Sequence, residues 1–256
     1  MKTLLVIFRS HSGPNVHAGG RVFEGPKEEL IVGCLRSLLR SMRGVDRTRY
    51  DVRFAILDDH SEEMCVRRMR DLAARESMVT TFVPLSARGV GPSFGASYAY
   101  ARDNPSDLIY FVEDDYLHAP SALAEMLEAQ EFFSQKLGGT EVAIFPVDYP
   151  DKYAPEAMKV SYLLLGPKRH WYLDRSTTGT FLISRTAYLA NIDLCMKMGL
   201  FRVDPIIHEG NSLNLIWTER GVQLFSPVPT LTIHMQSADL MPPYIDWQSW
   251  WKQYAS

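Results

Sequence analysis

The sequence predicts an α/β fold in which helices cover both faces of a mostly parallel central sheet. Short apolar runs alternate with segments of helical periodicity through the first 145 residues, as is typical of parallel strands joined by helical crossovers. A chain of 256 residues with 46% hydrophobic content can build one large core. We therefore expect a single domain over residues 1–256, with a regular half up to about residue 145 and a less regular half after it.

Five apolar runs in the first half are expected to be strands, because each is short and bounded by polar or turn residues. They cover residues 3–8, 52–57, 79–83, 108–112 and 142–145. Helices are expected to begin near Pro26, to cover residues 62–74 and 93–102, and to begin again at Pro120, since proline suits the first position of a helix. The first helix has an apolar face of Leu30, Ile31, Cys34, Leu35, Leu38, Leu39 and Met42.

The second half has a weaker pattern. We expect strands over residues 160–165, 180–184 and 231–234, and helices over residues 186–198 and from 209 or 210 to about 220. No internal repeat, low-complexity segment or flexible linker separates the two halves, so they are expected to share one core.

Composition and charge exclude several classes of function. The net charge is −3 and the basic residues are spread along the chain, whereas a nucleic-acid-binding protein usually carries a basic face. The three cysteines form no CxxC pair and their odd number argues against a disulfide framework, so a cytoplasmic location is expected. No apolar stretch approaches the roughly 20 residues that span a bilayer, so no transmembrane segment is expected.

The C-terminal aromatic residues Trp247, Trp250, Trp251 and Tyr254 allow two interpretations. They either pack back on the domain as a strap or make a peripheral contact with a membrane surface. The strap is favoured, because few lysines or arginines flank these residues.

Ligands of parallel sheets bind at the carboxyl ends of the strands, which directs attention to residues 9–11, 58–61, 88–91 and 113–115. Glu113, Asp114 and Asp115 are three consecutive carboxylates at the end of a buried strand. A role in capping the next helix explains these acids poorly. If Pro120 is the first residue of that helix, its cap is Ala119, and the acids lie several residues before it. Adjacent like charges repel unless a cation compensates them, so this segment predicts a Mn²⁺ or Mg²⁺ site shared with substrate phosphates.

Two further strand ends carry polar side chains. Ser61 can cap the next helix, which leaves Asp58 and Asp59 free to accept hydrogen bonds from a base or from ribose hydroxyls. Arg88 belongs to a glycine-containing loop that matches neither GxGxxG nor the P-loop pattern. A guanidinium at this position suits bases and phosphates alike.

Together these segments resemble the GT-A glycosyltransferases, and family 2 in particular. Asp58-Asp59-His60-Ser61 is similar to that family's DD-x-S nucleotide turn, and Glu113-Asp114-Asp115 is similar to its DXD element. The stretch 89–104 resembles the glycine- and asparagine-bearing helix that links the two. The resemblance covers residues 3–145 well and the rest loosely. It implies a nucleotide-sugar-binding half up to about residue 145 and an acceptor-binding half over 146–256.

The resemblance also implies roles for individual residues of the donor site. The residues implied to bind the nucleotide are Arg9, Ser10, Asp58, Asp59, Arg88, Glu113 and Asp114. Among them, Asp58 and Asp59 would contact the base and ribose, Arg88 would flank the base, and Asp114 would reach the ribose. Asp115 would hold the metal on the diphosphate. His234, which ends an apolar strand, would complete the metal shell or simply make a strand-end hydrogen bond.

In the second half the resemblance implies a carboxylate base near the start of a helix. Glu209 is the best match, Asp204 is the alternative, and an ordinary acid at a helix N-terminus is the structural explanation. Family members often carry a Glu-Asp pair where this chain has His208-Glu209. Thr178 and Gly179 lie in a segment that resembles the acceptor loop, and Trp171 or Tyr172 would stack on a sugar ring.

The implied function is metal-dependent transfer of a sugar from a nucleoside diphosphate donor, with a UDP-sugar favoured, to a glycan or other hydroxyl acceptor, with inversion at the anomeric carbon. A sugar-phosphate nucleotidyltransferase is one alternative. It would need a glycine-rich basic loop after the first strand, and residues 9–20 contain Gly13, Gly19 and Gly20 but no lysine. The other alternative is a non-catalytic protein that binds nucleotide-sugars or glycans.

Overall fold

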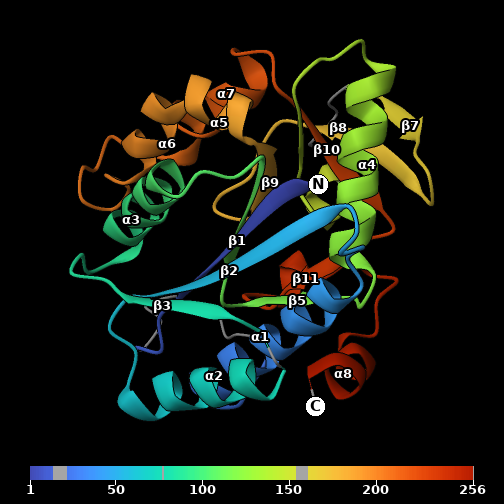
Figure 1. The fold of residues 1–256 in the computed structure, drawn as a ribbon. Coiled ribbons are helices and arrows are strands. Elements are labelled where there is room, and N and C mark those ends of the chain that lie inside the picture. The colour runs from blue at the N-terminus through green and yellow to red at the C-terminus, as the bar shows by residue number, and fades with distance from the viewer. Residues whose placement is uncertain (14–21, 77, 154–160, 256) are drawn as a thin grey trace.

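The computed structural model describes residues 1–13, 22–76, 78–153 and 161–255. Nine strands form one sheet in the order β3-β2-β1-β4-β9-β6-β10-β8-β7 (Figure 1). Only β8 and β9 run against the other strands of this sheet. The predicted fold class, a mostly parallel sheet with packed helices, is therefore confirmed, and both halves of the chain contribute strands to the sheet.

The first half contributes β1 (Lys2–Ser10), β2 (Tyr50–Asp58), β3 (Thr80–Pro84) and β4 (Leu108–Glu113), close to the predicted ranges. The central strand β1 pairs in parallel with both β2 and β4, with Ser10 opposite Asp58 and Arg9 opposite Glu113. This register brings the polar ends of three strands to one edge of the sheet.

The helices of the first half are α1 (Lys27–Arg43), α2 (Glu63–Arg75), α3 (Val90–Asp103) and α4 (Ala122–Lys136). All seven predicted apolar residues of α1 are buried. Pro120 lies in the turn before α4 instead of starting it. In Figure 1, α1 and α2 lie on one side of the sheet, and α3 and α6, which pack against each other, lie on the other.

β6 (Val142–Ile144) ends the first half, close to its predicted range. The second half contributes β7 (Leu163–Leu165), β8 (His170–Asp174), β9 (Phe181–Ser184) and β10 (Gln223–Val228). The sequence pattern did not predict β8 or β10. The predicted strand over 160–165 is reduced to β7, and residue 160 lies outside the described residues. Short 3₁₀ turns cover η1 (Pro150–Tyr153) and η4 (Ala238–Leu240).

Two predicted helices of the second half are broken. The segment 186–198 forms α5 (Arg185–Ala190) and α6 (Ile192–Met198). Between them, the Asn191 side-chain amide donates to the Ala187 carbonyl at 2.8 Å, a bond that competes with the helical ladder. The segment 209–220 forms a 3₁₀ turn, η3 (Glu209–Asn211), and the short helix α7 (Asn214–Thr218), separated by a non-helical Ser212.

A separate two-stranded sheet joins distant parts of the chain. β5 (Tyr116–His118) follows the triple acid directly and pairs antiparallel with β11 (Thr232–His234). The register places His234 opposite Tyr116, and the Met235 N–H donates to the Asp115 carbonyl at 2.8 Å. This pairing carries His234 to the end of the triple acid.

The C-terminal aromatic residues pack on the domain. They lie on α8 (Trp247–Trp250) and the π-helical turn η5 (Trp251–Ala255), which contacts α1. Trp251 lies against Gly33 of α1, where a side chain would collide with its ring, and its ring centroid is 4.4 Å from that of Phe23. The C-terminal aromatic segment therefore packs back on the domain as a strap, as the favoured interpretation of the sequence predicts.

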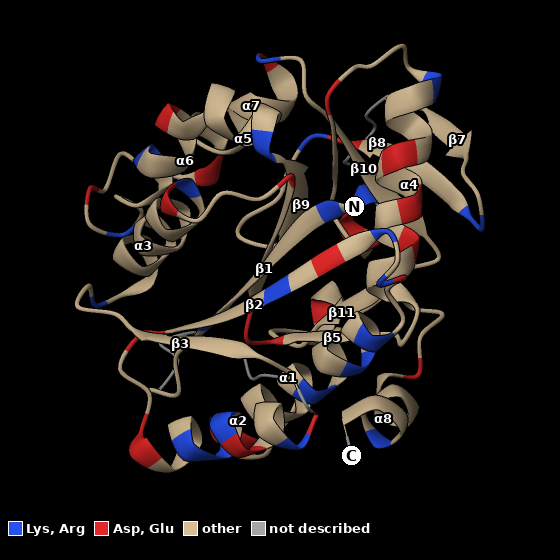
Figure 2. Cartoon of the chain, in the orientation of Figure 1, with Lys and Arg blue, Asp and Glu red and all other residues tan. Residues whose placement is uncertain are grey.

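Among the described residues, no helix combines the length and the apolar character needed to cross a membrane. Figure 2 shows acidic and basic residues interspersed over the ribbon. All three cysteines are buried and carry free thiols.

Candidate functional site

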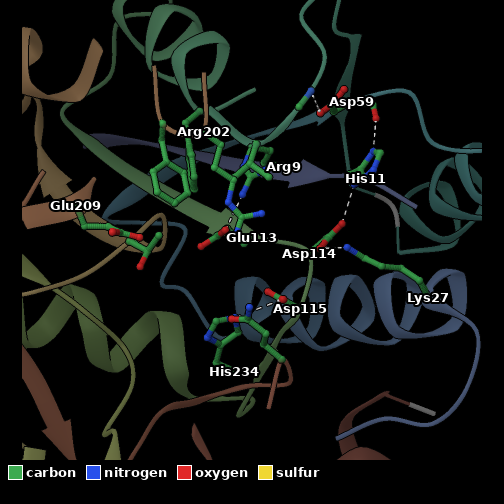
Figure 3. A pocket seen from close by; sticks show the side chains of 16 residues that line it. Arg9, His11, Lys27, Asp59, Glu113, Asp114, Asp115, Arg202, Glu209 and His234 are labelled. Carbon is green, nitrogen blue, oxygen red and sulfur yellow. Dashed lines mark hydrogen bonds and ion pairs between the residues drawn. The ribbon is translucent and has the colours of Figure 1, made fainter. Parts of the chain in front are cut away.

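A cavity of about 290 Å³ opens where β1, β2 and β4 end (Figure 3). Residues from both halves of the chain line it. They are Arg9, His11, Lys27, Asp59, Gly89, Val90, Phe94, Glu113, Asp114, Asp115, Thr178, Phe201, Arg202, Glu209, His234 and Gln236. Its position agrees with the rule that ligands of such sheets bind at the carboxyl ends of the strands.

Glu113 and Arg9 form a partly buried ion pair on neighbouring strands. Arg9 Nη2 lies 2.5 Å from Glu113 Oε1, and Arg9 Nη1 donates to Ser93 Oγ at 3.0 Å. The guanidinium also stacks on Phe94, 4.0 Å from the ring centroid. Burial raises the pKa of Glu113, and Arg9 opposes this shift. The charge of Arg9 is therefore already matched within the protein.

Asp114 is held by the segments that follow β1. Lys27 Nζ lies 3.2 Å from Asp114 Oδ1, and the His11 backbone N–H donates to Asp114 Oδ2 at 2.7 Å. The sequence pattern did not single out Lys27. A signal exists, however: a cation at the first position of a helix opposes the helix dipole, so its presence there indicates an acidic partner.

Asp115 and His234 form the third pair, with His234 Nε2 3.3 Å from Asp115 Oδ2. Burial acts to raise the pKa of Asp115, but the charge and hydrogen bond of His234 outweigh it and hold that pKa below its ordinary value. Burial acts to lower the pKa of His234, and Asp115 outweighs it in the same way and raises that pKa. The pair is mutually stabilised in its charged form.

Two tyrosines fix the His234 ring. The Tyr149 hydroxyl lies 2.6 Å from His234 Nδ1 and 3.2 Å from the Tyr116 hydroxyl. The Tyr116 ring stacks on the imidazole with the ring centroids 4.4 Å apart. With Nδ1 bonded to Tyr149, Nε2 is the nitrogen directed at Asp115.

The donor atoms at this point suit a hard divalent cation. The second carboxylate oxygen of Asp115, Oδ1, is buried and has no hydrogen-bond partner among the described residues. Carboxylate oxygen and imidazole nitrogen are ligands that Mn²⁺ accepts. In the described part of the chain, no group of three or more His, Cys, Asp or Glu is arranged to hold a metal ion. A metal bound by Asp115 and His234 would thus take its other ligands from substrate and water.

The two adjacent aspartates after β2 have different surroundings. Asp59 lines the cavity, and its Oδ2 accepts the Gly89 N–H at 2.9 Å. Asp58 lies outside the cavity lining, where it accepts hydrogen bonds from the Ser10 hydroxyl at 2.8 Å and the Ser61 N–H at 3.0 Å. Asp58 and Ser10, both predicted to bind nucleotide, are therefore buried partners of each other that join β1 to β2.

The loop after β3 reaches the cavity through its glycine. Arg88, predicted to flank the base, is exposed and is absent from the cavity lining, whereas Gly89 lines it. Gly89 has φ of 102°, a conformation that side chains rarely adopt. This turn points the Gly89 N–H at Asp59.

The wall from the second half contains Thr178 and Glu209. Figure 3 shows Glu209 on the side of the cavity away from Lys27 and His11. Glu209 opens η3, whose cap is the His208 ring accepting from the Gly210 N–H at 3.1 Å. Asp204 is absent from the cavity lining and accepts the Ile206 N–H at 3.0 Å, as expected of a residue that opens a turn.

Two residues predicted to bind the acceptor have structural roles. Trp171 is only 1% exposed and packs in the core against Phe133, so the expected stacking on a sugar ring does not agree with its position. A Cβ atom at Gly179 would lie 2.2 Å from Phe94 and 2.6 Å from Glu113. Gly179 therefore allows its loop to lie directly against Phe94 and Glu113.

Comparisons with known proteins give the fold. No family model matches this sequence, and no curated protein matches it significantly. Among solved structures, the chain is similar to GalNAc-T7 in complex with UDP, GalNAc and Mn²⁺, with 11% identity over 96% of this chain and 46% of that chain, and a TM-score of 0.57. It is also similar to the mannosyltransferase PcManGT from Pyrobaculum calidifontis in complex with GDP-Man and Mn²⁺, with 13% identity over 98% of this chain and 61% of that chain, and a TM-score of 0.50.

S. aureus TarS in complex with UDP-GlcNAc aligns with 14% identity over 88% of this chain and 58% of that chain, at a TM-score of 0.49. The chain thus spans less than two thirds of each of these proteins. The likeness to the first two structures shows that this chain has the GT-A fold of nucleotide-sugar glycosyltransferases. Most of the loop expected to distinguish a nucleotidyltransferase, residues 14–20, lies outside the described residues.

Proposed function

We propose that this chain, which has the GT-A fold, is a metal-dependent glycosyltransferase. It would transfer a sugar from a nucleoside diphosphate donor, with a UDP-sugar as the first candidate, to an acceptor hydroxyl in glycan synthesis. The observation that carries the proposal is the meeting of Asp115 and His234 in a cavity that also contains Asp59 and Glu209. These residues come from four distant segments, and core packing does not require carboxylates at that point.

The donor would lie along the ends of β1, β2 and β4. Asp59 and the nearby Gly89 turn would bind the base or ribose, and Asp114 would bind a ribose hydroxyl. The Arg9–Glu113 pair would form the floor beneath the transferred sugar. Solved structures of similar fold contain UDP with Mn²⁺ or GDP-Man with Mn²⁺, which supports a nucleotide-sugar as the ligand of this cavity.

Asp115 and His234 would hold the divalent cation, which when bound supplies positive charge to the departing diphosphate. Glu209 would accept the proton of the acceptor hydroxyl as its oxygen attacks the anomeric carbon. The bond from that carbon to the diphosphate oxygen breaks, and its electron pair leaves with the nucleoside diphosphate. Attack from the Glu209 side, opposite the leaving group, would invert the anomeric configuration.

Release of nucleoside diphosphate from a nucleotide-sugar tests this proposal. The protein is incubated with UDP-GlcNAc or GDP-Man and Mn²⁺, with and without EDTA, and the products are separated by chromatography. A glycosyltransferase is expected to release UDP or GDP slowly when water is the acceptor and faster when a suitable acceptor is added. Both reactions should require the metal. Formation of a nucleoside triphosphate from added pyrophosphate would instead indicate a nucleotidyltransferase. Tight binding with no turnover under any condition would indicate a non-catalytic binding protein.

A further inference from the structure

Arg202 differs from the other cations of the cavity. Arg9 is paired with Glu113, and Lys27 is paired with Asp114. Arg202 also lines the cavity, but it has no acidic partner among the described residues, and its guanidinium carbon lies 5.3 Å from the ring centroid of its neighbour Phe201. Within the described part of the chain, Arg202 is therefore a cation at the cavity that no acidic side chain neutralises.

The backbone holds Arg202 at this position against its conformational preference. Its φ of 61° lies in the left-handed region, which costs energy for a residue other than glycine. The preceding residue is clamped to α3, because a Cβ atom at Gly91 would lie 2.0 Å from the Phe201 carbonyl oxygen. Gly95 of α3 and Gly199 also lie close together, since a Cβ at Gly95 would lie 3.2 Å from Gly199 Cα.

The charges of the cavity show what this cation is suited to bind. The acids that line it are Asp59, Glu113, Asp114, Asp115 and Glu209, and the lysine and arginines are Arg9, Lys27 and Arg202. Acids outnumber these cations, so an anionic ligand would need positive charge beyond the two ion pairs, from Arg202 as well as from the metal. Planar guanidinium donors match phosphate oxygens in pairs, which a lysine cannot do.

We propose that Arg202 binds the diphosphate of the donor and stays on that group as it departs. This inference rests on the proposed function and extends it to a residue from the acceptor half of the chain. Arg202 and the metal held by Asp115 would then neutralise the diphosphate from two sides. The second possible source of an anion in this cavity is a charged acceptor, and the experiment separates the two.

Calorimetry in the presence of Mn²⁺ tests the proposal with four probes: UDP, GDP, inorganic pyrophosphate and uridine. The variants are Arg202→Ala and Arg202→Lys, which keep a Cβ atom and hence the backbone strain of the native residue. Arg67→Ala, which removes an exposed guanidinium on α2 outside the cavity, is the matched control. Melting curves establish that all four proteins are folded.

Arg202→Ala is expected to weaken binding of the nucleoside diphosphate and of pyrophosphate by roughly ten- to hundredfold, the range for a lost charged hydrogen bond. Uridine affinity should not change, Arg202→Lys should lie between, and Arg67→Ala should match the native protein. The proposal would be overturned if Arg202→Ala binds UDP and GDP as tightly as the native protein does. If that variant also has a raised KM for the acceptor, Arg202 binds the acceptor instead. If the native protein binds neither UDP nor GDP, the proposed function itself is wrong.

Discussion

The Tyr149 hydroxyl lies 2.6 Å from Nδ1 of His234, and this contact decides which nitrogen of the ring faces the cavity. In the neutral ring, which is the form that binds a metal, a proton on Nδ1 donated to Tyr149 leaves Nε2 with the lone pair that a metal ligand needs. Groups that orient a metal-binding histidine in this way raise metal affinity without touching the metal. Tyr149 is therefore a positioning residue for the site that we assign to Asp115 and His234.

Tyr149→Phe should weaken Mn²⁺ binding about ten- to hundredfold, because the ring of His234 loses its hydrogen bond while the aromatic packing stays. The affinity is measured by the electron paramagnetic resonance signal of free Mn²⁺ in the presence of UDP or GDP. Tyr153→Phe is the control, since it removes a hydroxyl that donates to Asp148 at 2.6 Å instead. Equal Mn²⁺ affinity in both variants would show that Tyr149 has no positioning role.

Asp58 and Asp59 should separate into a stability residue and a binding residue. Asp59→Ala should weaken nucleotide binding by about 1.5–3 kcal/mol, the value of a charged hydrogen bond. Asp58→Ala should instead lower the free energy of unfolding by about 1–3 kcal/mol, because it leaves the Ser10 hydroxyl and the Ser61 N–H without their buried partner. Calorimetry and urea unfolding of both variants give the comparison. The distinction is wrong if Asp58→Ala loses affinity and keeps its stability.

Glu209→Gln should lower turnover by roughly 100- to 10,000-fold, the usual contribution of a general base, and leave donor affinity nearly unchanged. Asp204→Asn is the matched control, because Asp204 is outside the cavity lining. Steady-state rates and calorimetry measure the two effects. If Glu209→Gln keeps turnover within a few-fold of the native value, Glu209 is not the base. The anomer of the product would then need to be assigned, since a retaining mechanism requires no such base.

His118 should make the fold sensitive to acid. Burial lowers its pKa from 6.5 to about 4, although a hydrogen bond to the Tyr116 carbonyl opposes the shift. The unfolded chain therefore binds a proton at higher pH than the folded protein, so stability present above pH 6.5 is lost as the pH falls toward 4. The loss from this residue should be about 3 kcal/mol.

Urea unfolding between pH 7 and pH 4 measures this loss. His118→Gln should flatten the pH dependence, and His170→Gln, at an exposed position, should leave it unchanged. If the unfolding free energy of His118→Gln depends on pH as strongly as that of the native protein, this account of His118 is wrong.

The regular first half could be predicted because its signals are local. Apolar runs and helical periodicity placed β1, β2, β4 and α1, and the parallel-sheet rule then pointed to the Glu113–Asp115 segment. Pairing between distant segments has no local signal. The hydrogen bonds that bring β5 to β11, and thus His234 to Asp115, form between residues more than 100 positions apart, so His234 remained open between two roles.

The same reason explains the errors in the second half. β8 was not predicted, so the burial of Trp171 within the sheet could not be foreseen. The sequence pattern did not point to Arg202, because it could not show that Arg9 and Lys27 have acidic partners and that Arg202 has none among the described residues. The periodicity of residues 186–198 indicates one helix, but the hydrogen bond from the Asn191 side chain to the Ala187 carbonyl competes with the helical hydrogen bonds and divides the segment into two helices. In each case tertiary contacts outweighed the local pattern.

Calorimetric titration of UDP and GDP, with Mn²⁺ and with EDTA, tests the central claim most directly. The native protein should bind at least one of them with Mn²⁺ and lose most of that affinity with EDTA. Asp115→Ala should stay folded and show no metal enhancement, whereas Asp103→Ala, at an exposed acid on α3, should behave as the native protein does. Equal nucleotide affinity with Mn²⁺ and with EDTA would contradict a metal-dependent diphosphate site at Asp115 and His234.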